Sequence, residues 1–219
     1  MINLIFFLPK FSHEGAGNST FRLCKNLNKK KYKINIISLG KNSYKKDLEN
    51  IGCRVYEIKH TRVFRSMFVI LPLVKRIYDK SMNKNIFISA HHHTNVFSII
   101  FLRKLRKLKI IVIERSDISE LLIFNNIKDY IKNKIIYLLV KICYKKANLI
   151  ISNSKSGKKD LTQICNAKVI NIPSPSFIKK TKKKLLNKID ILKLIAVGRL
   201  SKEKGNKIYN VLIDHGIRT

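Results

Sequence analysis

The feature that most constrains the fold is a regular alternation of short apolar runs with amphipathic segments. Apart from Asn3, Ile2–Leu8 is a continuous apolar run, as expected for a strand buried on both faces. Further strands are predicted at Tyr32–Leu39, 53–58, 86–89, 110–113, Leu149–Ser152 and 168–172. Helical spacing of apolar residues predicts the main helices at 64–80, 95–105, 127–144 and 154–164. This alternation is typical of βαβ units, so we expect an α/β fold with a Rossmann-like, doubly wound, mostly parallel sheet.

The pattern changes near the end of the chain, which suggests how the domains are organised. Residues 1–172 are expected to form one domain, whereas 173–190 contain two prolines and a lysine-rich run and are predicted to be a linker. Residues 191–197 have the pattern of a new buried strand. One strand and one helix cannot bury a core of their own. We therefore interpret 191–219 as the truncated start of a second domain, a partial second βα unit.

The charge of the chain is strongly positive, with 46 Lys and Arg against 13 Asp and Glu, a net charge of +33. Such a field attracts phosphates, anionic lipid headgroups or nucleic acid. Lys far outnumbers Arg, although Arg is the better residue for bidentate recognition, and no nucleic-acid-binding motif is present. Composition bias with some attraction to membranes is thus favoured, and no nucleic-acid partner is expected.

One predicted helix, 64–80, combines basic and apolar residues in a way that would suit an anionic membrane surface. Arg62 and Arg65 lie beside Phe68 and Leu71 in the sequence. An ordinary amphipathic helix packed on the sheet is the simpler interpretation of the same pattern, and we favour it here.

The cysteines and the apolar runs indicate a cytoplasmic protein. Cys24, Cys53, Cys143 and Cys165 are widely spaced, without a CxxC pair, so free thiols in a reducing compartment are expected. The apolar start of the chain lacks the basic segment and cleavage site of a signal peptide. No apolar run approaches the ~18 residues needed to span a bilayer. We expect a cytoplasmic location, with peripheral attachment to the inner face of the membrane as the alternative.

Candidate site residues are expected where predicted strands end, because ligands of such sheets bind beyond the carboxyl ends of the strands. Gly15 and Gly17 lie after the first strand, just before a helix that we expect to begin at Asn18 or Ser19. Backbone N–H groups at such a place suit an anion or a closely approaching ligand, although a tight turn alone is the simpler interpretation of the glycines. Arg115 follows the strand at 110–113 and could contact a ligand, whereas a helix cap would account for its neighbours but not for Arg115 itself.

Three histidines, His91, His92 and His93, directly follow the strand at 86–89. A substrate contact by one of them and a mere helix cap by Thr94 or Asn95 are both open. A metal site is disfavoured, because adjacent residues rarely all point at one ion and no acidic residue lies nearby in the sequence.

The most specific signal is Gly198-Arg199-Leu200 followed by Lys204-Gly205, just past the strand predicted at 191–197. Arg199 supplies a fork of donors and Lys204 a point charge, a suitable pair for a diphosphate. The alternative is a basic turn in an already basic protein.

The order of these elements resembles family 4 glycosyltransferases, which have the GT-B architecture of two Rossmann-like domains facing a cleft. The resemblance implies that residues 1–172 form the N-terminal, acceptor-binding half of a GT-B fold. It implies a donor-diphosphate role for Arg199 and Lys204, acceptor-side contacts for Gly15, Gly17 and Arg115, and a catalytic role for His92 or His93. A donor motif of paired glutamates, which the family carries further along, is not present in the sequence.

The function implied is retaining transfer of a sugar from a nucleotide-sugar to a glycan or lipid-linked acceptor in cell-envelope polysaccharide synthesis. The nucleotide-sugar is a co-substrate, and no metal or other cofactor is expected. Transfer needs both walls of the cleft, so the chain by itself is expected to be an inactive fragment. The alternative is a basic α/β module that binds nucleic acid or membrane surfaces without catalysis.

Overall fold

The computed structural model describes residues 1–174, apart from residues 14, 61, 79–83 and 123–125. The predicted linker beyond Ser174 and the predicted start of a second domain at 191–219 lie outside the described residues. Arg199 and Lys204 lie there too.

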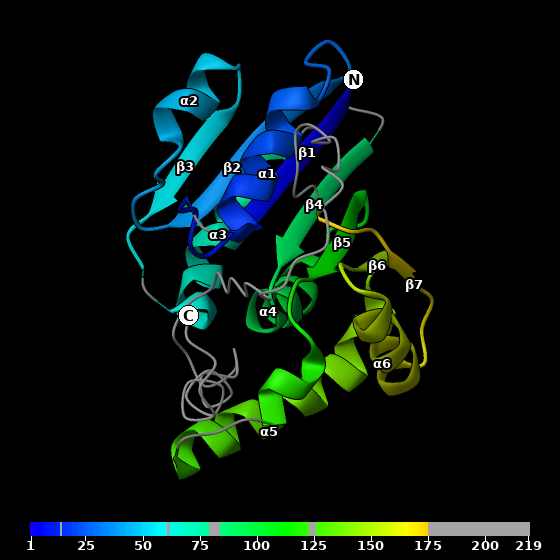
Figure 1. Cartoon of the computed structure of the whole chain (residues 1–219). Coiled ribbons are helices and arrows are strands. Elements are labelled where there is room, and N and C mark those ends of the chain that lie inside the picture. The colour runs from blue at the N-terminus through cyan, green and yellow to red at the C-terminus, as the bar shows by residue number, and fades with distance from the viewer. Residues whose placement is uncertain (14, 61, 79–83, 123–125, 175–219) are drawn as a thin grey trace, which may run out of the picture. The chain divides into compact units, whose positions relative to one another are not determined.

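The described chain is built on a seven-stranded sheet in the order β3-β2-β1-β4-β5-β6-β7, with every neighbouring pair parallel (Figure 1). The strands are β1 (Ile2–Leu8), β2 (Tyr32–Leu39), β3 (Arg54–Ile58), β4 (Lys84–Ala90), β5 (Leu108–Glu114), β6 (Leu149–Ser152) and β7 (Val169–Asn171). The helices are α1 (Gly15–Asn26), α2 (Lys45–Asn50), α3 (Val63–Ile77), α4 (His92–Leu102), α5 (Ile127–Cys143) and α6 (Lys155–Cys165), with 3-10 turns η1 (Ile118–Leu122) and η2 (Tyr144–Lys146). The predicted Rossmann-like, doubly wound sheet is confirmed.

Two apolar cores lie on opposite faces of this sheet, as the mostly apolar sequence of β1 predicts. Ile5 and Phe7 of β1 pack into one core together with α3, α4, α5 and α6. Leu4 and Phe6 point to the other face, where α1 and α2 pack. The chain therefore winds one way from β1 through α1 and α2, and the other way from β4 onward. All four cysteines are buried and free, as predicted.

Buried amide side chains connect three adjacent strands, β2, β1 and β4. Asn35 Nδ2 of β2 donates to Asn3 Oδ1 of β1 at 2.8 Å, and Asn3 Nδ2 donates to Asn85 Oδ1 of β4 at 2.8 Å. A slip of one residue would turn one of these amides to the opposite face of the sheet and leave its partner unsatisfied. The ladder therefore stabilises the register of β1 against β4, the pair beside which the candidate site forms.

Two helix starts were predicted wrongly. Helix α1 begins at Gly15 rather than at Asn18 or Ser19, so Gly15 and Gly17 lie in its first turn and not in a preceding loop. Glycine in a sequence usually indicates the end of a helix. Here Gly17 lies within α1, because the absence of a side chain lets the backbone of Ser12 pack closely against the helix.

Helix α4 begins at His92, three residues before the predicted start. His91 is the residue that precedes the first turn, and its φ of 78° turns the chain sharply out of β4. The carbonyl of His91 accepts the N–H of Asn95 at 2.9 Å. Only the tertiary structure makes a positive φ acceptable at a non-glycine residue, so local sequence patterns do not indicate this start.

Candidate ligand-binding site

The candidate site lies where the winding direction of the sheet reverses, between β1 and β4. Chain leaving β1 continues to β2, whereas chain leaving β4 continues to β5 on the other side. The strand ends are level, since Phe7 pairs with Ser89 and Ala90 pairs with Ile113. Such a switch point opens a crevice between diverging loops, and this is the usual ligand position in doubly wound sheets. The first turns of α1 and α4, which carry Gly15, His92 and His93, and the loop that carries Arg115 therefore lie at the same edge of the sheet.

The first turn of α1 follows β1 at this edge of the sheet. A Cβ atom on Gly17 would lie 2.9 Å from the backbone nitrogen of Ser12 and closer still to its carbonyl oxygen. Gly17 is therefore required by the packing of the preceding loop. A Cβ on Gly15 would meet nothing within 4 Å, so Gly15 borders open space. Of the two glycines, Gly15 is the one that leaves room for a ligand.

The three histidines have three different environments. His91 is exposed, His93 is half-buried and His92 is almost fully buried. Nδ1 of His92 lies 2.6 Å from Oε2 of Glu114, the last residue of β5. Burial lowers the pKa of His93, and the positive charge of Lys132 lowers it further. His93 is therefore neutral at neutral pH and able to accept a proton or a hydrogen bond.

A buried polar network lies beneath these histidines. Asn95 Nδ2 donates to Glu114 Oε1 at 2.6 Å, and its Oδ1 accepts the hydroxyl of Ser89 at 2.8 Å. The hydroxyl of Tyr144 also donates to Glu114 Oε1. Burial raises the pKa of Tyr144 well above its ordinary value, with the carboxylate of Glu114 adding to the effect, so the phenol stays protonated and donates. The network fixes the loop after β4 to the end of β5.

Sequence reasoning did not find this network, apart from placing Glu114 in a charged cluster after a strand. Tyr144 follows α5 and lies 30 positions from Glu114, and nothing in its neighbourhood signals a polar role. Asn95 is, from the sequence, only a candidate helix cap. A buried carboxylate at the end of an apolar strand was the one signal that could have suggested polar partners nearby.

Arg115 bridges β5 and α1. Its guanidinium donates to the hydroxyl of Ser19 and, at 3.1 Å, to that of Thr20. Since β4 separates β5 from β1 in the sheet, this contact crosses the carboxyl end of β4. A helix cap would explain the residues next to Arg115 but not Arg115 itself. These hydrogen bonds to α1 give Arg115 a structural role of its own. Its Nε is buried and has no hydrogen-bond partner among the described residues.

The end of β6 adds a further polar loop beside the network. The N–H of Asn153 donates to the carbonyl of Glu114 at 3.2 Å. Ser154 caps α6 by accepting the N–H of Gly157 at 2.9 Å, and its hydroxyl donates to Asp117 at 3.2 Å. Asp117 and Ser154 thus fasten two neighbouring loops, and Asp117 serves as a loop anchor rather than as the cap of a helix.

Neither a metal centre nor a membrane span was found in the part of the chain that the structure describes. No three His, Cys, Asp or Glu side chains there are grouped to hold an ion. No helix among the same residues has the length and apolar character needed to cross a bilayer. The expectation that no metal or cofactor is needed stays a prediction.

Comparison with known proteins gives a fold but no family. No protein-family description and no curated protein matches the sequence. Among solved structures, HepE from Anabaena in complex with UDP and glucose matches with a TM-score of 0.55 and 14% identity, over 80% of this chain and 45% of that one. The N-terminal domain of trehalose-6-phosphate phosphatase from Candida albicans matches with a TM-score of 0.48 and 10% identity, over 78% and 47%. The chain thus spans less than half the length of either protein.

At these identities the likeness concerns the fold alone, and the second match is too weak to carry an argument. The fold is Rossmann-like and similar to a domain of a GT-B glycosyltransferase. This agrees with the predicted architecture, but it does not single out family 4. The roles predicted for individual residues stay predictions.

Proposed function

We propose that the chain carries the acceptor-binding domain of a glycosyltransferase that moves a sugar from a nucleotide-sugar to a glycan or lipid-linked acceptor. The observation that carries the proposal is the position of Gly15, His93 and Arg115 after β1, β4 and β5, at the edge of a Rossmann-like sheet where its winding direction reverses. The likeness to HepE supports it, because that protein was crystallised with UDP and glucose, the two components of a nucleotide-sugar.

The geometry favours different roles for the two candidate histidines. His93 is half-buried and neutral at neutral pH, so it can accept a hydrogen bond or a proton from an acceptor hydroxyl. His92 is held against Glu114 and positions the first turn of α4. Arg115 already bonds to α1, so its proposed contribution is to shape the acceptor crevice.

On the donor side, the proposal depends on Arg199 and Lys204. Breaking the bond to the diphosphate develops negative charge on the leaving group, which an Arg and a Lys would stabilise. This assignment comes from the sequence pattern Gly198-Arg199-Leu200 with Lys204-Gly205. The class of transfer, retaining as in family 4, is part of the same proposal.

Binding is the most direct test, because transfer in this architecture needs groups from both domains. Calorimetric titration of the 219-residue chain with UDP, UDP-glucose and a panel of other nucleotide-sugars is expected to show saturable binding of at least one. Arg199→Ala and Lys204→Ala should each weaken it at least tenfold. Lys202→Ala, a loss of the same positive charge two residues from Lys204, is the matched control and should bind normally.

Two results would overturn the proposal. One is the absence of saturable binding to every nucleotide and nucleotide-sugar together with strong binding to duplex DNA that falls steeply with salt, the signature of a phosphate-binding module. The other is an equal loss of affinity in Lys202→Ala, which would reduce the donor contact to general attraction by positive charge.

A further inference from the structure

The outer surface of helix α5 has an unusual distribution of side chains. Only Ile136, Val140 and Cys143 of this helix are buried, and all of them lie in its C-terminal half. Figure 1 shows the N-terminal half of α5 extending away from the sheet. The helix therefore packs on the protein core over only part of its length.

A second apolar stripe runs along the opposite side of α5. Its members are Ile127, Ile131, Ile135, Leu138 and Ile142, and each side chain is between 50% and 69% exposed. Their spacing of three or four residues places them in one line on the helix surface. With 3.6 residues per turn, that line lies on the far side of the helix from the buried residues. Five large aliphatic side chains are thus turned toward solvent in a row.

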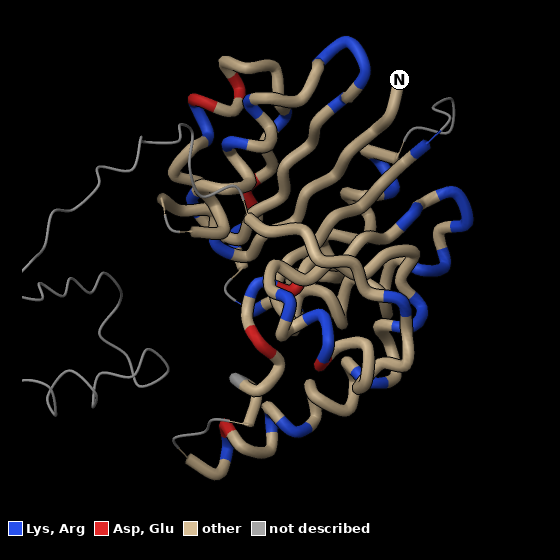
Figure 2. Tube along the Cα trace, turned by 45° about the vertical axis from the view of Figure 1, so that its right-hand side comes forward, with Lys and Arg blue, Asp and Glu red and all other residues tan. Residues whose placement is uncertain are grey.

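Lysines flank the stripe on both sides. By the same helical spacing, Lys128 and Lys132 lie along one flank, and Lys134 and Lys141 along the other. All four are exposed. Figure 2 shows that basic residues are spread over much of the described chain, α5 included. Lys132 pairs with Asp129 at 3.3 Å, and Asp129 is the only acidic residue in α5. An apolar face between two rows of cations is the pattern of a helix that lies in the interface of an anionic bilayer.

Exposed apolar side chains are also found on α3, which α4 connects to α5. Helix α4 packs against both α3 and α5. Phe64 and Phe68 of α3 are each at least half exposed, and their rings contact Phe101 of α4 at centroid distances of 6.1 and 5.4 Å. The exposed aromatic rings of α3 therefore form a second apolar group, on a helix that α4 connects to α5.

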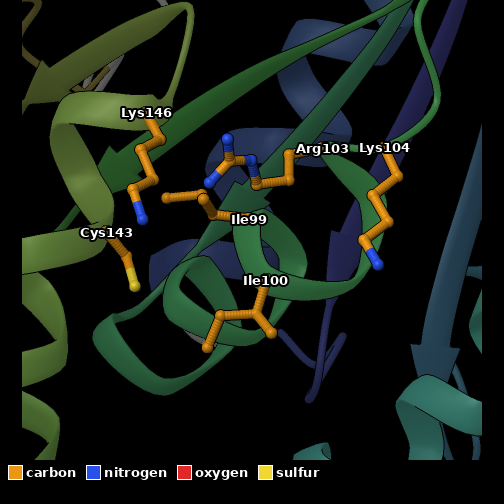
Figure 3. A pocket seen from close by; sticks show the side chains of 6 residues that line it. All are labelled: Ile99, Ile100, Arg103, Lys104, Cys143 and Lys146. Atoms are coloured by element: carbon orange, nitrogen blue, oxygen red, sulfur yellow. The ribbon is translucent and has the colours of Figure 1, made fainter.

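A cavity of about 310 Å³ lies between α4 and the end of α5 (Figure 3). Ile99, Ile100 and Cys143 provide apolar lining, and Arg103, Lys104 and Lys146 contribute three cationic side chains. No acidic side chain of the described residues lines it. Apolar walls with cations suit a phospholipid, whose phosphate would meet the cations while its glycerol and acyl carbons meet the isoleucines.

We propose that the outer face of α3, α4 and α5, centred on the α5 stripe, docks the protein onto the surface of an anionic phospholipid bilayer. The apolar stripe enters the headgroup region, and the flanking lysines contact lipid phosphates. This docking needs no nucleotide-sugar chemistry, so it stands or fails independently of the proposed enzymatic function.

The test is flotation of the full 219-residue chain with vesicles of phosphatidylcholine alone or with about 30% phosphatidylglycerol, the anionic fraction being chosen to give a negative surface potential. We expect flotation with the anionic vesicles that declines between low and high salt, and little with the neutral ones. The combined variant Ile131→Ser, Ile135→Ser and Leu138→Ser should reduce the floated fraction at least fivefold. Since these side chains are exposed, the variant should keep its fold, which far-UV circular dichroism checks.

A matched pair of charge variants separates the specific surface from the general charge of the chain. Changing Lys128, Lys132, Lys134 and Lys141 to Gln should lower flotation several-fold. Changing Lys25, Lys30, Lys31 and Lys46 to Gln removes the same charge from exposed positions outside this surface. That control should float almost as well as the unmodified chain.

The proposal is overturned if both quadruple variants lose flotation equally, or if the serine variant floats normally. It is also overturned if the chain floats with neither the anionic nor the neutral vesicles. Sedimentation that shows a dimer dispersed by the serine substitutions, without vesicle binding, would instead assign the stripe to a contact between two copies of the chain.

Discussion

Nδ1 of His92 lies 2.6 Å from Oε2 of Glu114, so the first residue of α4 and the last residue of β5 form a buried polar pair. The second carboxylate oxygen of Glu114 accepts hydrogen bonds from Asn95 and Tyr144. One side chain therefore holds the loop after β4, the start of α4 and the segment after α5. This arrangement fixes the first turn of α4, which carries His93.

The first prediction concerns this network. Glu114→Ala should lower the free energy of unfolding by about 3 to 5 kcal/mol, because it leaves buried donors without an acceptor. Urea denaturation followed by circular dichroism measures the change. Glu49→Ala, at an exposed position on α2, is the control and should alter stability by less than about 0.5 kcal/mol. A loss of similar size in both variants would argue against the network.

The second prediction compares the two glycines of α1. Gly17→Ala places a methyl group against the backbone of Ser12 and should cost about 1 to 3 kcal/mol, the usual range for overpacking. Gly15→Ala meets open space and should leave stability unchanged or raise it by less than about 1 kcal/mol, since alanine favours helix. The thermal unfolding midpoint should therefore be clearly lower for Gly17→Ala than for Gly15→Ala. Equal shifts would contradict the close approach of Ser12.

The third prediction concerns His91, whose φ of 78° lies in a region that favours glycine. His91→Gly should raise the free energy of unfolding by about 1 kcal/mol, because relief of strain exceeds the added entropy of the unfolded chain. His91→Ala keeps a Cβ atom and hence the strain, so it should bring no such gain. A glycine variant no more stable than the alanine variant would show that the backbone here is unstrained.

The fourth prediction concerns pH. Burial lowers the pKa of His93 below its ordinary value, so the unfolded chain takes up a proton at a pH where the folded protein resists it. Stability should therefore fall as the pH drops from neutrality through about 6.5, the unperturbed value, and below it. Denaturation midpoints measured between about pH 7.5 and pH 5, a range that brackets this value, check the trend.

A variant tests whether His93 causes this fall in stability at acidic pH. His93→Gln should reduce the loss of stability on acidification, whereas His60→Gln, at an exposed position, should follow the unmodified protein. If His93→Gln keeps the full acid dependence, another group is responsible for it.

Much of the fold could be predicted from the sequence, because periodicity reports burial directly. The bounds of β1, β2 and β6 were predicted as found, since a short segment rich in apolar and β-branched residues is typical of a strand buried in a parallel sheet. The strand ends also indicated which loops to consider as ligand contacts. The two wrong helix starts, at Gly15 and His92, lie where close backbone contact and a positive φ replace local preference.

The order of apolar and polar residues predicts the alternation of strands and helices. That alternation implies a parallel sheet, in which the loops that follow the strands lie at one edge. Three further features depend on the tertiary structure: β1 and β4 are neighbours, Arg115 bonds to α1, and Tyr144 reaches Glu114. The reason is physical. Periodicity records whether a residue is buried, but a hydrogen bond between residues far apart in the chain depends on the order of the strands, which local patterns do not encode.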